Sequence, residues 1–279
     1  MNDKAIPESA FVIRTYAELA VWAAEFKQGR HNLLGIVSSP GLSKSTTFEK
    51  MFRGEMALFV AGHATAYQVY HELHGYRNKP VIIDDANTLF EDRRTRPLLI
   101  QLCETKPLKT LRWMTGGDLD VPKEYHTTSK VAILCNEFRA SNRNLQAVLS
   151  RGIFVHFIPN AAEVHRYVGQ WFVVDEATRE IYDFIGGHLD LIDTPDIRRY
   201  LNARSLHHRS NWRDDILQYL CPKLDQKGME LAAMIMDDDA AHIDGEMERS
   251  RTFTRMTGLS QATYYRYCEI IRDNRDGSR

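Results

Sequence analysis

The amino-acid sequence predicts an α/β fold, with a mostly parallel sheet covered by helices and an all-helical region after it. Three apolar runs, at residues 33–37, 80–83 and 130–135, have the continuous hydrophobicity of buried parallel strands. Segments with apolar residues at three- and four-residue steps alternate with these runs, which favours helices on both faces of the sheet. After residue 160 the strand pattern ends and the helical spacing continues.

The other elements follow from local pattern. Apolar residues at 10–28 have near-helical spacing and predict a helix beside the first strand. A polar segment at 116–128 opens with two glycines and predicts a loop. The further elements expected before residue 160 are strands at 57–60, 110–115 and 153–158 and helices at 44–53, 65–75, 93–104 and 142–152. Those expected after it are helices at 161–172, 178–191, 196–207 and 212–220.

These elements group into three parts. A chain of 279 residues can hold one large domain and one or two small ones. We expect an α/β nucleotide-binding core at 1–159, a helical lid at 160–222 and a C-terminal helix-turn-helix segment at 223–279.

The first apolar run breaks into a loop of small residues that ends in Lys44 and Ser45. Such a loop binds phosphates, because its backbone N–H groups converge on phosphate oxygens at a helix N-terminus. The lysine balances phosphate charge, and the hydroxyl binds Mg²⁺. In the pattern G-x-x-x-x-G-K-[ST], however, the two outer glycines are replaced by Ser38 and Ser43. The residues expected to hold the nucleotide are Ser39, Pro40, Gly41, Leu42, Ser43, Lys44, Ser45 and Thr46.

Polar residues end the two other apolar runs. One run ends in Asp84 and Asp85, and the other in Asn136, where ligands of parallel sheets bind. We expect Asp84 to join Ser45 in the Mg²⁺ shell, Asp85 to orient the attacking water and Asn136 to sense the γ-phosphate. Alternatively, the two aspartates begin a following helix as its N-cap and first-turn acid, and Asn136 only turns the chain.

Two arginines complete the series. Arg151 closes the helix predicted at 142–152 in a Ser-Arg pair, and Arg198 lies at the start of a later helix, after Pro195 and Asp196. The order of phosphate loop, acidic strand, polar strand tip, Ser-Arg pair and arginine in a helical region resembles the AAA+ ATPases. This resemblance covers residues 33–220.

The resemblance implies an AAA+ ATPase with ATP and Mg²⁺ as ligands. By that likeness, Arg151 resembles the arginine finger offered to a neighbouring subunit's nucleotide, so a homo-oligomeric ring or filament is implied. Arg198 resembles the lid arginine called sensor 2, although Arg199 competes for this role. Alternatively, Arg151 is a solvated cation at a helix end. The implied catalytic residues are Asp85, Asn136, Arg151 and Arg198, and the implied Walker A and Walker B pairs are Lys44 with Ser45 and Asp84 with Asp85.

The polar segment at 116–128 precedes the strand that ends in Asn136. In relatives of this ATPase class, inserts near this place form pore loops that contact DNA or a client protein. Here Lys123, Tyr125 and His126 would make such contacts. A plain surface loop is the equal alternative.

The C-terminal part changes sign of charge along its length. Residues 225–248 hold eight acidic residues and one lysine, whereas residues 249–279 hold seven arginines and three acidic residues. We expect the acidic stretch to form a solvated helix face.

In the basic half, Gly258, Leu259 and Ser260 separate two helical patterns. Ser260 is a good N-cap and Leu259 a good apolar plug for the turn. The arrangement resembles the helix-turn-helix of site-specific recombinases and transposon-linked regulators. Alternatively, it is a helical hairpin packed on the lid, with tyrosines in its core and arginines in solvent. If the segment binds DNA, the residues expected to face the groove are Gln261, Thr263, Tyr264 and Arg266.

Composition limits the remaining possibilities. The formal net charge is −1, so whole-chain charge does not indicate a polyanionic partner. The four cysteines have no paired metal spacing and are expected to be buried thiols in a reducing cytoplasm. No apolar run reaches the length of a membrane span, so we expect a cytoplasmic protein without a membrane partner.

Two classes of function remain. The first is an ATPase that assembles through inter-subunit ATP sites and acts on DNA, in replication initiation, helicase loading or transposition, with a replication or recombination protein as client. The second is a hydrolysis-poor nucleotide switch that regulates transcription through its DNA-binding tail. Ser43 in place of a glycine and Asp85 in place of a glutamate both predict slow hydrolysis.

Overall fold

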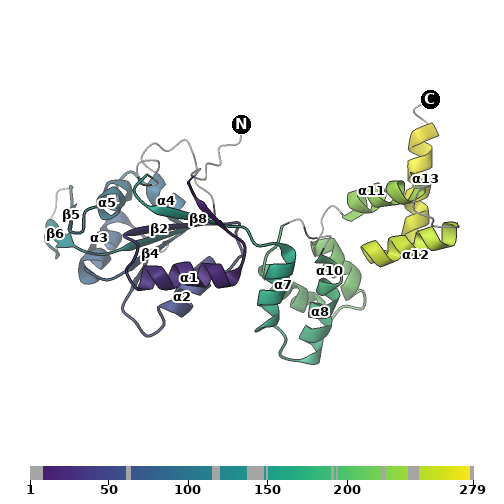
Figure 1. The fold of residues 1–279 in the computed structure, drawn as a ribbon, viewed down its shortest axis with the longest axis horizontal. Coiled ribbons are helices and arrows are strands. Elements are labelled where there is room, and N and C mark those ends of the chain that lie inside the picture. The colour runs from purple at the N-terminus through teal and green to yellow at the C-terminus, as the bar shows by residue number, and fades with distance from the viewer. Residues whose placement is uncertain are drawn as a thin grey trace. The chain divides into compact units, whose positions relative to one another are not determined.

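The computed structural model describes residues 9–60, 64–114, 120–136, 148, 150–189, 192, 194–220, 224–237 and 245–276 (Figure 1). The chain divides into two compact units, Met1–Asn160 and Ala161–Arg279. This division lies next to the predicted end of the core at residue 159. The boundary predicted between residues 222 and 223 falls inside the second unit.

The first unit contains a six-stranded parallel sheet, which confirms the predicted fold class. Its strands, in spatial order, are β1(Phe11–Ile13), β8(Ile153–Phe157), β2(Leu33–Val37), β7(Val131–Cys135), β4(Val81–Asp84) and β3(Leu58–Val60). Val131 of β7 pairs with Leu33 of β2 on one side and with Val81 of β4 on the other. The three central strands therefore start level and end at the same edge of the sheet.

Helices cover both faces of this sheet. The alternation of side chains along a strand sends Val37, Ile83 and Ile133 into one core cluster with Leu73 and Leu98. These last two residues belong to α3(Ala66–Gly75) and α5(Thr95–Leu102), and α4(Ala86–Glu91) packs against α5. Figure 1 shows α1(Tyr16–Lys27) and α2(Lys44–Met51) on the side of the sheet away from α4 and α5.

The helix predicted at 10–28 is wrong at its start, because residues 11–13 form strand β1 at the edge of the sheet. Thr15 then begins α1 with a capping box, in which its hydroxyl accepts from the Glu18 backbone N–H and the Glu18 carboxylate accepts from the Thr15 N–H. The Phe11 ring packs on Trp22 of α1, with 5.3 Å between ring centroids.

The loop predicted at 116–128 is also partly wrong. Residues 124–127 form β6(Glu124–Thr127), which pairs antiparallel with β5(Lys109–Arg112) in a separate two-stranded sheet. Tyr125 of β6 is buried and its hydroxyl donates to the Tyr70 carbonyl. The strand alternates exposed and buried residues, and three of its four residues are polar or charged, so its pattern was taken for a loop.

The described part of the second unit is helical. The helices predicted between residues 161 and 220 are confirmed as α7(Ala161–Gly169), α8(Glu176–Gly186), α9(Arg198–Leu206) and α10(Trp212–Leu220), and their role as a lid stays a prediction. Three further helices follow, α11(Leu224–Asp237), α12(Glu246–Thr257) and α13(Gln261–Asp276). None of the described helices is both long and apolar enough to cross a lipid bilayer.

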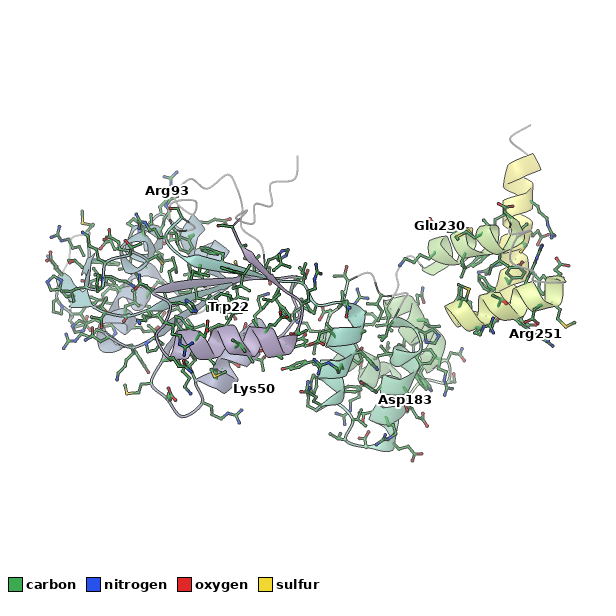
Figure 2. All side chains as sticks on the ribbon, in the orientation of Figure 1. Trp22, Lys50, Arg93, Asp183, Glu230 and Arg251 are labelled. Atoms are coloured by element: carbon green, nitrogen blue, oxygen red, sulfur yellow. The ribbon has the colours of Figure 1, made fainter. Side chains whose placement is uncertain are left out.

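The last three helices share one apolar cluster. It joins Ala232 and Ile235 of α11 to Phe253 of α12 and to Tyr264 and Tyr267 of α13. The acidic helix α11 therefore contributes apolar side chains to a core and charged side chains to the solvated surface. Figure 2 labels two exposed charged residues of this segment, Glu230 of α11 and Arg251 of α12. The three helices pack on one another within the second unit, and Leu259 of their turn also packs against Leu217 of α10 and Phe184 of α8.

A tight turn joins α12 to α13 where the sequence predicted it. Gly258 has a positive φ of 73° at the end of α12, and Leu259 packs against the three-helix cluster. Ser260 caps α13, because its Oγ accepts from the Thr263 backbone N–H at 3.2 Å.

The two adjacent tyrosines of α13 give a matched test of this packing. We predict that Tyr264→Ala lowers the free energy of unfolding of the three-helix segment by about 3 kcal/mol or more, because it empties a buried aromatic site. Tyr265→Ala removes a ring that is 42% exposed and is expected to change it by about 0.5 kcal/mol or less. Hydrogen exchange of the α12 and α13 amides measures both, and equal losses of protection in the two variants would contradict the packing.

Candidate nucleotide site

The loop between β2 and α2 spans residues 38–43. Ser38 is buried, and its backbone N–H donates to the Cys135 carbonyl at 3.3 Å, which fixes the start of the loop against β7. The backbone is left-handed at Gly41, with φ of 76°, and at Ser43, with φ of 57°. Leu42 is buried, so it offers the loop its backbone only. Ser43 thus adopts a left-handed backbone conformation that glycine adopts more easily, and this costs some strain.

Lys44 lies at the centre of the site, with its side chain buried inside the loop. Its Nζ donates to the Ser38 Oγ at 2.8 Å, to the Ser38 carbonyl at 3.0 Å and to the Ser39 carbonyl at 3.2 Å. It also donates to Asn136 Oδ1 at 3.1 Å. Asn136 follows β7 directly, so the lysine joins the loop to the neighbouring strand.

Ser45 and Asp84 form the second contact across strands. The Ser45 Oγ donates to Asp84 Oδ2 at 2.6 Å, a short hydrogen bond from a hydroxyl to a carboxyl oxygen. The other oxygen, Asp84 Oδ1, accepts from the Asp85 backbone N–H at 3.0 Å. The carboxylate of Asp84 therefore faces the loop.

Asp85 is exposed and has a left-handed backbone, with φ of 54°. Helix α4 begins at the next residue, Ala86, so the helix required by the N-cap alternative is present. Asp84, however, uses its oxygens on Ser45 and on the adjacent N–H. The left-handed turn at Asp85 separates the end of β4 from α4 and adds a second strained residue to the site.

Groups of both charge signs meet at the site and do not cancel, because one lysine faces two aspartates. Burial raises the pKa of the Cys135 thiol, and the same thiol feels the positive charge of Lys44 and the negative charges of Asp84 and Asp85. A neutral thiol therefore lies under one ammonium and two carboxyl groups. This arrangement fits a ligand that is itself charged, such as a phosphate with a divalent cation.

The donor set fits Mg²⁺ and nucleotide phosphates. Hydroxyl and carboxylate oxygens are the ligands that Mg²⁺ prefers, and Ser45 and Asp84 already meet. The N-terminus of α2 with the preceding loop offers backbone N–H groups to an anion. The structure thus brings together Ser38, Lys44, Ser45, Asp84 and Asn136. Of the other predicted loop residues, Ser39, Pro40 and Thr46 are exposed beside them and Gly41 and Ser43 are partly buried.

Arg151 lies away from this group. It precedes β8, and Ile153 of β8 pairs with Leu34 near the start of β2, so Arg151 lies at the edge opposite the loop. Its Nη1 donates to the Ile100 carbonyl in the last turn of α5, at 3.2 Å. Arg151 is therefore a cation at the end of a helix, as the alternative to the arginine finger expects. The helix is α5, however, and not the one predicted at 142–152. The helix predicted at 142–152 lies outside the described residues except for its last part.

The structure distinguishes the two lid arginines. Arg199 is partly buried and its Nη1 donates to the Leu220 carbonyl at the end of α10. Arg198 is exposed at the start of α9, where its backbone N–H donates to Asp196. Arg199 therefore has a structural partner, which leaves Arg198 as the better candidate for a contact with a ligand.

The remaining predicted contact residues are only partly accessible. Lys123 and His126 are exposed, but Tyr125 of β6 is buried against Tyr70 and His74 of α3, so its expected surface contact is wrong. In α13, Gln261 and Arg266 are exposed and Thr263 is partly buried against Ser260. Tyr264 is buried, so its expected place on the groove-facing surface is wrong.

Sequence reasoning missed two features. The exposed tyrosine of α13 is Tyr265, which the helical period around the apolar Tyr264 and Tyr267 would have indicated. The hydroxyl of Ser38 binds Lys44, whereas the sequence marked Ser38 only as a lost glycine.

Comparison with known proteins shows a similarity of fold alone. The sequence matches no protein-family model, and it matches no curated protein. Among solved structures, the fold is similar to that of a Walker-type ATPase of Pyrococcus abyssi, with 10% sequence identity and a TM-score of 0.48. The match covers 93% of this chain and 89% of that one.

The two left-handed positions of the loop give a test with opposite signs. We predict that Ser43→Gly raises the free energy of unfolding of the first unit by up to about 1 kcal/mol, because glycine adopts a positive φ without a Cβ clash. Gly41→Ala is expected to lower it by about 1 kcal/mol or more. Urea unfolding measures both, and a destabilised Ser43→Gly would show that the serine is not strained.

Proposed function

We propose that this protein binds ATP with Mg²⁺ at the loop of residues 38–45 and hydrolyses it, as an ATPase of the AAA+ type. The observation that carries the proposal is the meeting of side chains from three adjacent strand ends. Lys44 contacts Asn136, and Ser45 contacts Asp84 at 2.6 Å. The order of these motifs along the chain supports the same family.

The residues divide the chemistry as follows. Lys44 balances the charge of the β- and γ-phosphates, and the N-terminus of α2 holds their oxygens. Ser45 and Asp84 would hold Mg²⁺, which supplies charge neutralisation at the phosphates. Asp85 orients and deprotonates the attacking water, and Asn136 contacts the γ-phosphate.

We infer that the nucleotide site is completed by a second copy of the chain. Arg151 lies at the edge of the sheet opposite the loop, and a strand of five residues, about 13 Å from first to last Cα, separates the two. That distance exceeds the reach of an arginine side chain, so Arg151 acts on a nucleotide only in a neighbouring copy. On the resemblance to the AAA+ ATPases, we also propose Arg198 as the sensor 2 arginine. Homo-oligomers of this kind are rings or filaments.

Mixing two inactive variants tests this arrangement. We predict that Lys44→Ala and Arg151→Ala each lower ATP turnover at least a hundredfold, the first through the phosphate contact and the second through the missing finger. A mixture of the two is expected to recover part of the activity, because some interfaces then pair an intact Lys44 with an intact Arg151. A turnover assay of each variant and of the mixture measures this, with Arg166→Ala on α7 as an unaffected control.

Two results would contradict the shared site. Full turnover in Arg151→Ala would remove the finger role, and a mixture no more active than its components would show that the sites do not form between copies.

We further propose that the three-helix segment binds DNA, and that the ATPase acts in replication initiation, helicase loading or transposition with a replication or recombination protein as client. Support comes from the turn between α12 and α13 and from the exposed stripe on α13, which includes Gln261, Tyr265 and Arg266. Tyr265 takes the place that the sequence gave to Tyr264.

Affinity for duplex DNA tests the segment. We predict that Arg266→Ala weakens DNA binding about tenfold and lowers its salt dependence, because a cation leaves the phosphate or base contact. Arg166→Ala on lid helix α7, where Arg166 pairs with Glu163, is the control and is expected to bind as the wild type does. Fluorescence anisotropy at several salt concentrations measures it. Unchanged affinity after removal of residues 245–279 would contradict DNA binding by this segment.

A second candidate function is a protein that binds nucleotide at the same site but hydrolyses it very slowly. The left-handed backbones of Ser43 and Asp85 favour it, because strain at the loop and at the water-orienting residue slows hydrolysis. In that case the protein is a nucleotide-dependent switch that regulates transcription. Nucleotide binding without turnover, with and without DNA, is the result that would establish the switch.

A further inference from the structure

We propose that Ser38 is a positioning residue that holds the ammonium of Lys44 back in the nucleotide-free loop and releases it when phosphate arrives. This inference rests on the proposed nucleotide site. It assigns a role to a residue that the phosphate-loop pattern treats as a missing glycine.

The hydrogen bonds of Lys44 carry the argument. Four acceptors lie within 3.2 Å of its Nζ, and an ammonium has three protons to donate. The lysine is therefore saturated by the protein itself. A phosphate oxygen reaches the ammonium only by displacing one or more of these acceptors.

The acceptors differ in how easily they leave. The carbonyl oxygens of Ser38 and Ser39 belong to the loop backbone. Ser38 Oγ and Asn136 Oδ1 belong to side chains that rotate between staggered positions. A phosphate oxygen is therefore expected to replace the two side-chain acceptors first. A glycine or alanine at position 38 would lack the first of them.

The Ser38 hydroxyl is itself oriented to accept. It donates its proton to the Ser39 carbonyl at 3.0 Å, so a lone pair remains for Lys44. Ser38 is 1% exposed, which removes water as a competing acceptor. The contact therefore stabilises the free loop.

Removal of the Ser38 hydroxyl is expected to tighten the binding of Mg·ATP. If the hydroxyl holds Lys44 only in the free protein, its removal leaves the bound state unchanged and raises the free energy of the free state. Ser38→Ala should then bind Mg·ATP more tightly, by about tenfold for one hydrogen bond to a charged group. The KM for ATP should fall by a similar factor while kcat stays the same.

The experiment titrates wild type, Ser38→Ala and Ser38→Gly with a fluorescent ADP analogue and with Mg·ATPγS, and measures KM and kcat for ATP. Ser129→Ala, a buried serine at the opposite edge of the sheet, is the matched control and should leave the affinities unchanged. Thermal unfolding checks that each variant folds, and Ser38→Gly gives a second reading because glycine fits any loop conformation.

Tighter binding in both Ser38 variants with unchanged kcat supports the role. Equal or weaker binding in folded variants, beside a wild type that binds, overturns the role of Ser38 and leaves the nucleotide site in place. Absence of Mg·ATP binding by the wild type overturns both.

Discussion

The parallel register of β2, β7 and β4 is the constraint on which the candidate site depends. Val37 pairs with Cys135, and Leu134 pairs with Asp84, so the three strands finish side by side. Each chain segment then leaves the sheet with a polar residue at the same edge. A shift of one residue in either pairing would turn every side chain of that strand to the other face and would separate Lys44 from Asn136 or Ser45 from Asp84. The apolar strands thus fix the geometry of the polar contacts that follow them.

The rigid edge of the sheet also explains how an unusual loop is tolerated. Left-handed backbone at Ser43 and Asp85 costs free energy, and these residues lie just before α2 and just after β4. Neighbouring residues hold both turns: Leu42 is buried in the core, and Asp84 is hydrogen-bonded to Ser45 and to the Asp85 N–H. The loop in turn keeps its lysine inside. The same contacts that stabilise the free site compete with a phosphate for Lys44, so affinity and stability are linked at this position.

Most of the fold followed from sequence, because continuous apolar runs and helical spacing are strong local signals. The predictions that failed concern segments whose structure depends on pairing with another strand, which the local sequence pattern does not reveal. Residues 11–13 share the apolar spacing of α1, yet their backbone pairs with β8, a partner more than 140 residues away. Strand β6 is mostly polar because one of its faces is solvated, so its pairing with β5 was hidden. The positions of Lys44, Ser45, Asp84 and Asn136 in one site were predicted from motif order. The inward side of α13 was not, because Tyr264 was assigned to the groove although its three-residue spacing from Tyr267 places both rings on the apolar side that packs against α11 and α12.

We propose that Ser45 and Asp84 hold the cation of a nucleotide that Lys44 binds. The most direct measurement is a crystal structure with a non-hydrolysable ATP analogue and Mn²⁺ in place of Mg²⁺, located by its anomalous scattering. The account predicts a manganese peak bonded to the Ser45 hydroxyl and within the first or second coordination sphere of Asp84, with phosphate oxygens on Lys44. A nucleotide bound elsewhere, or a manganese ion without Ser45 and Asp84 around it, would contradict the account.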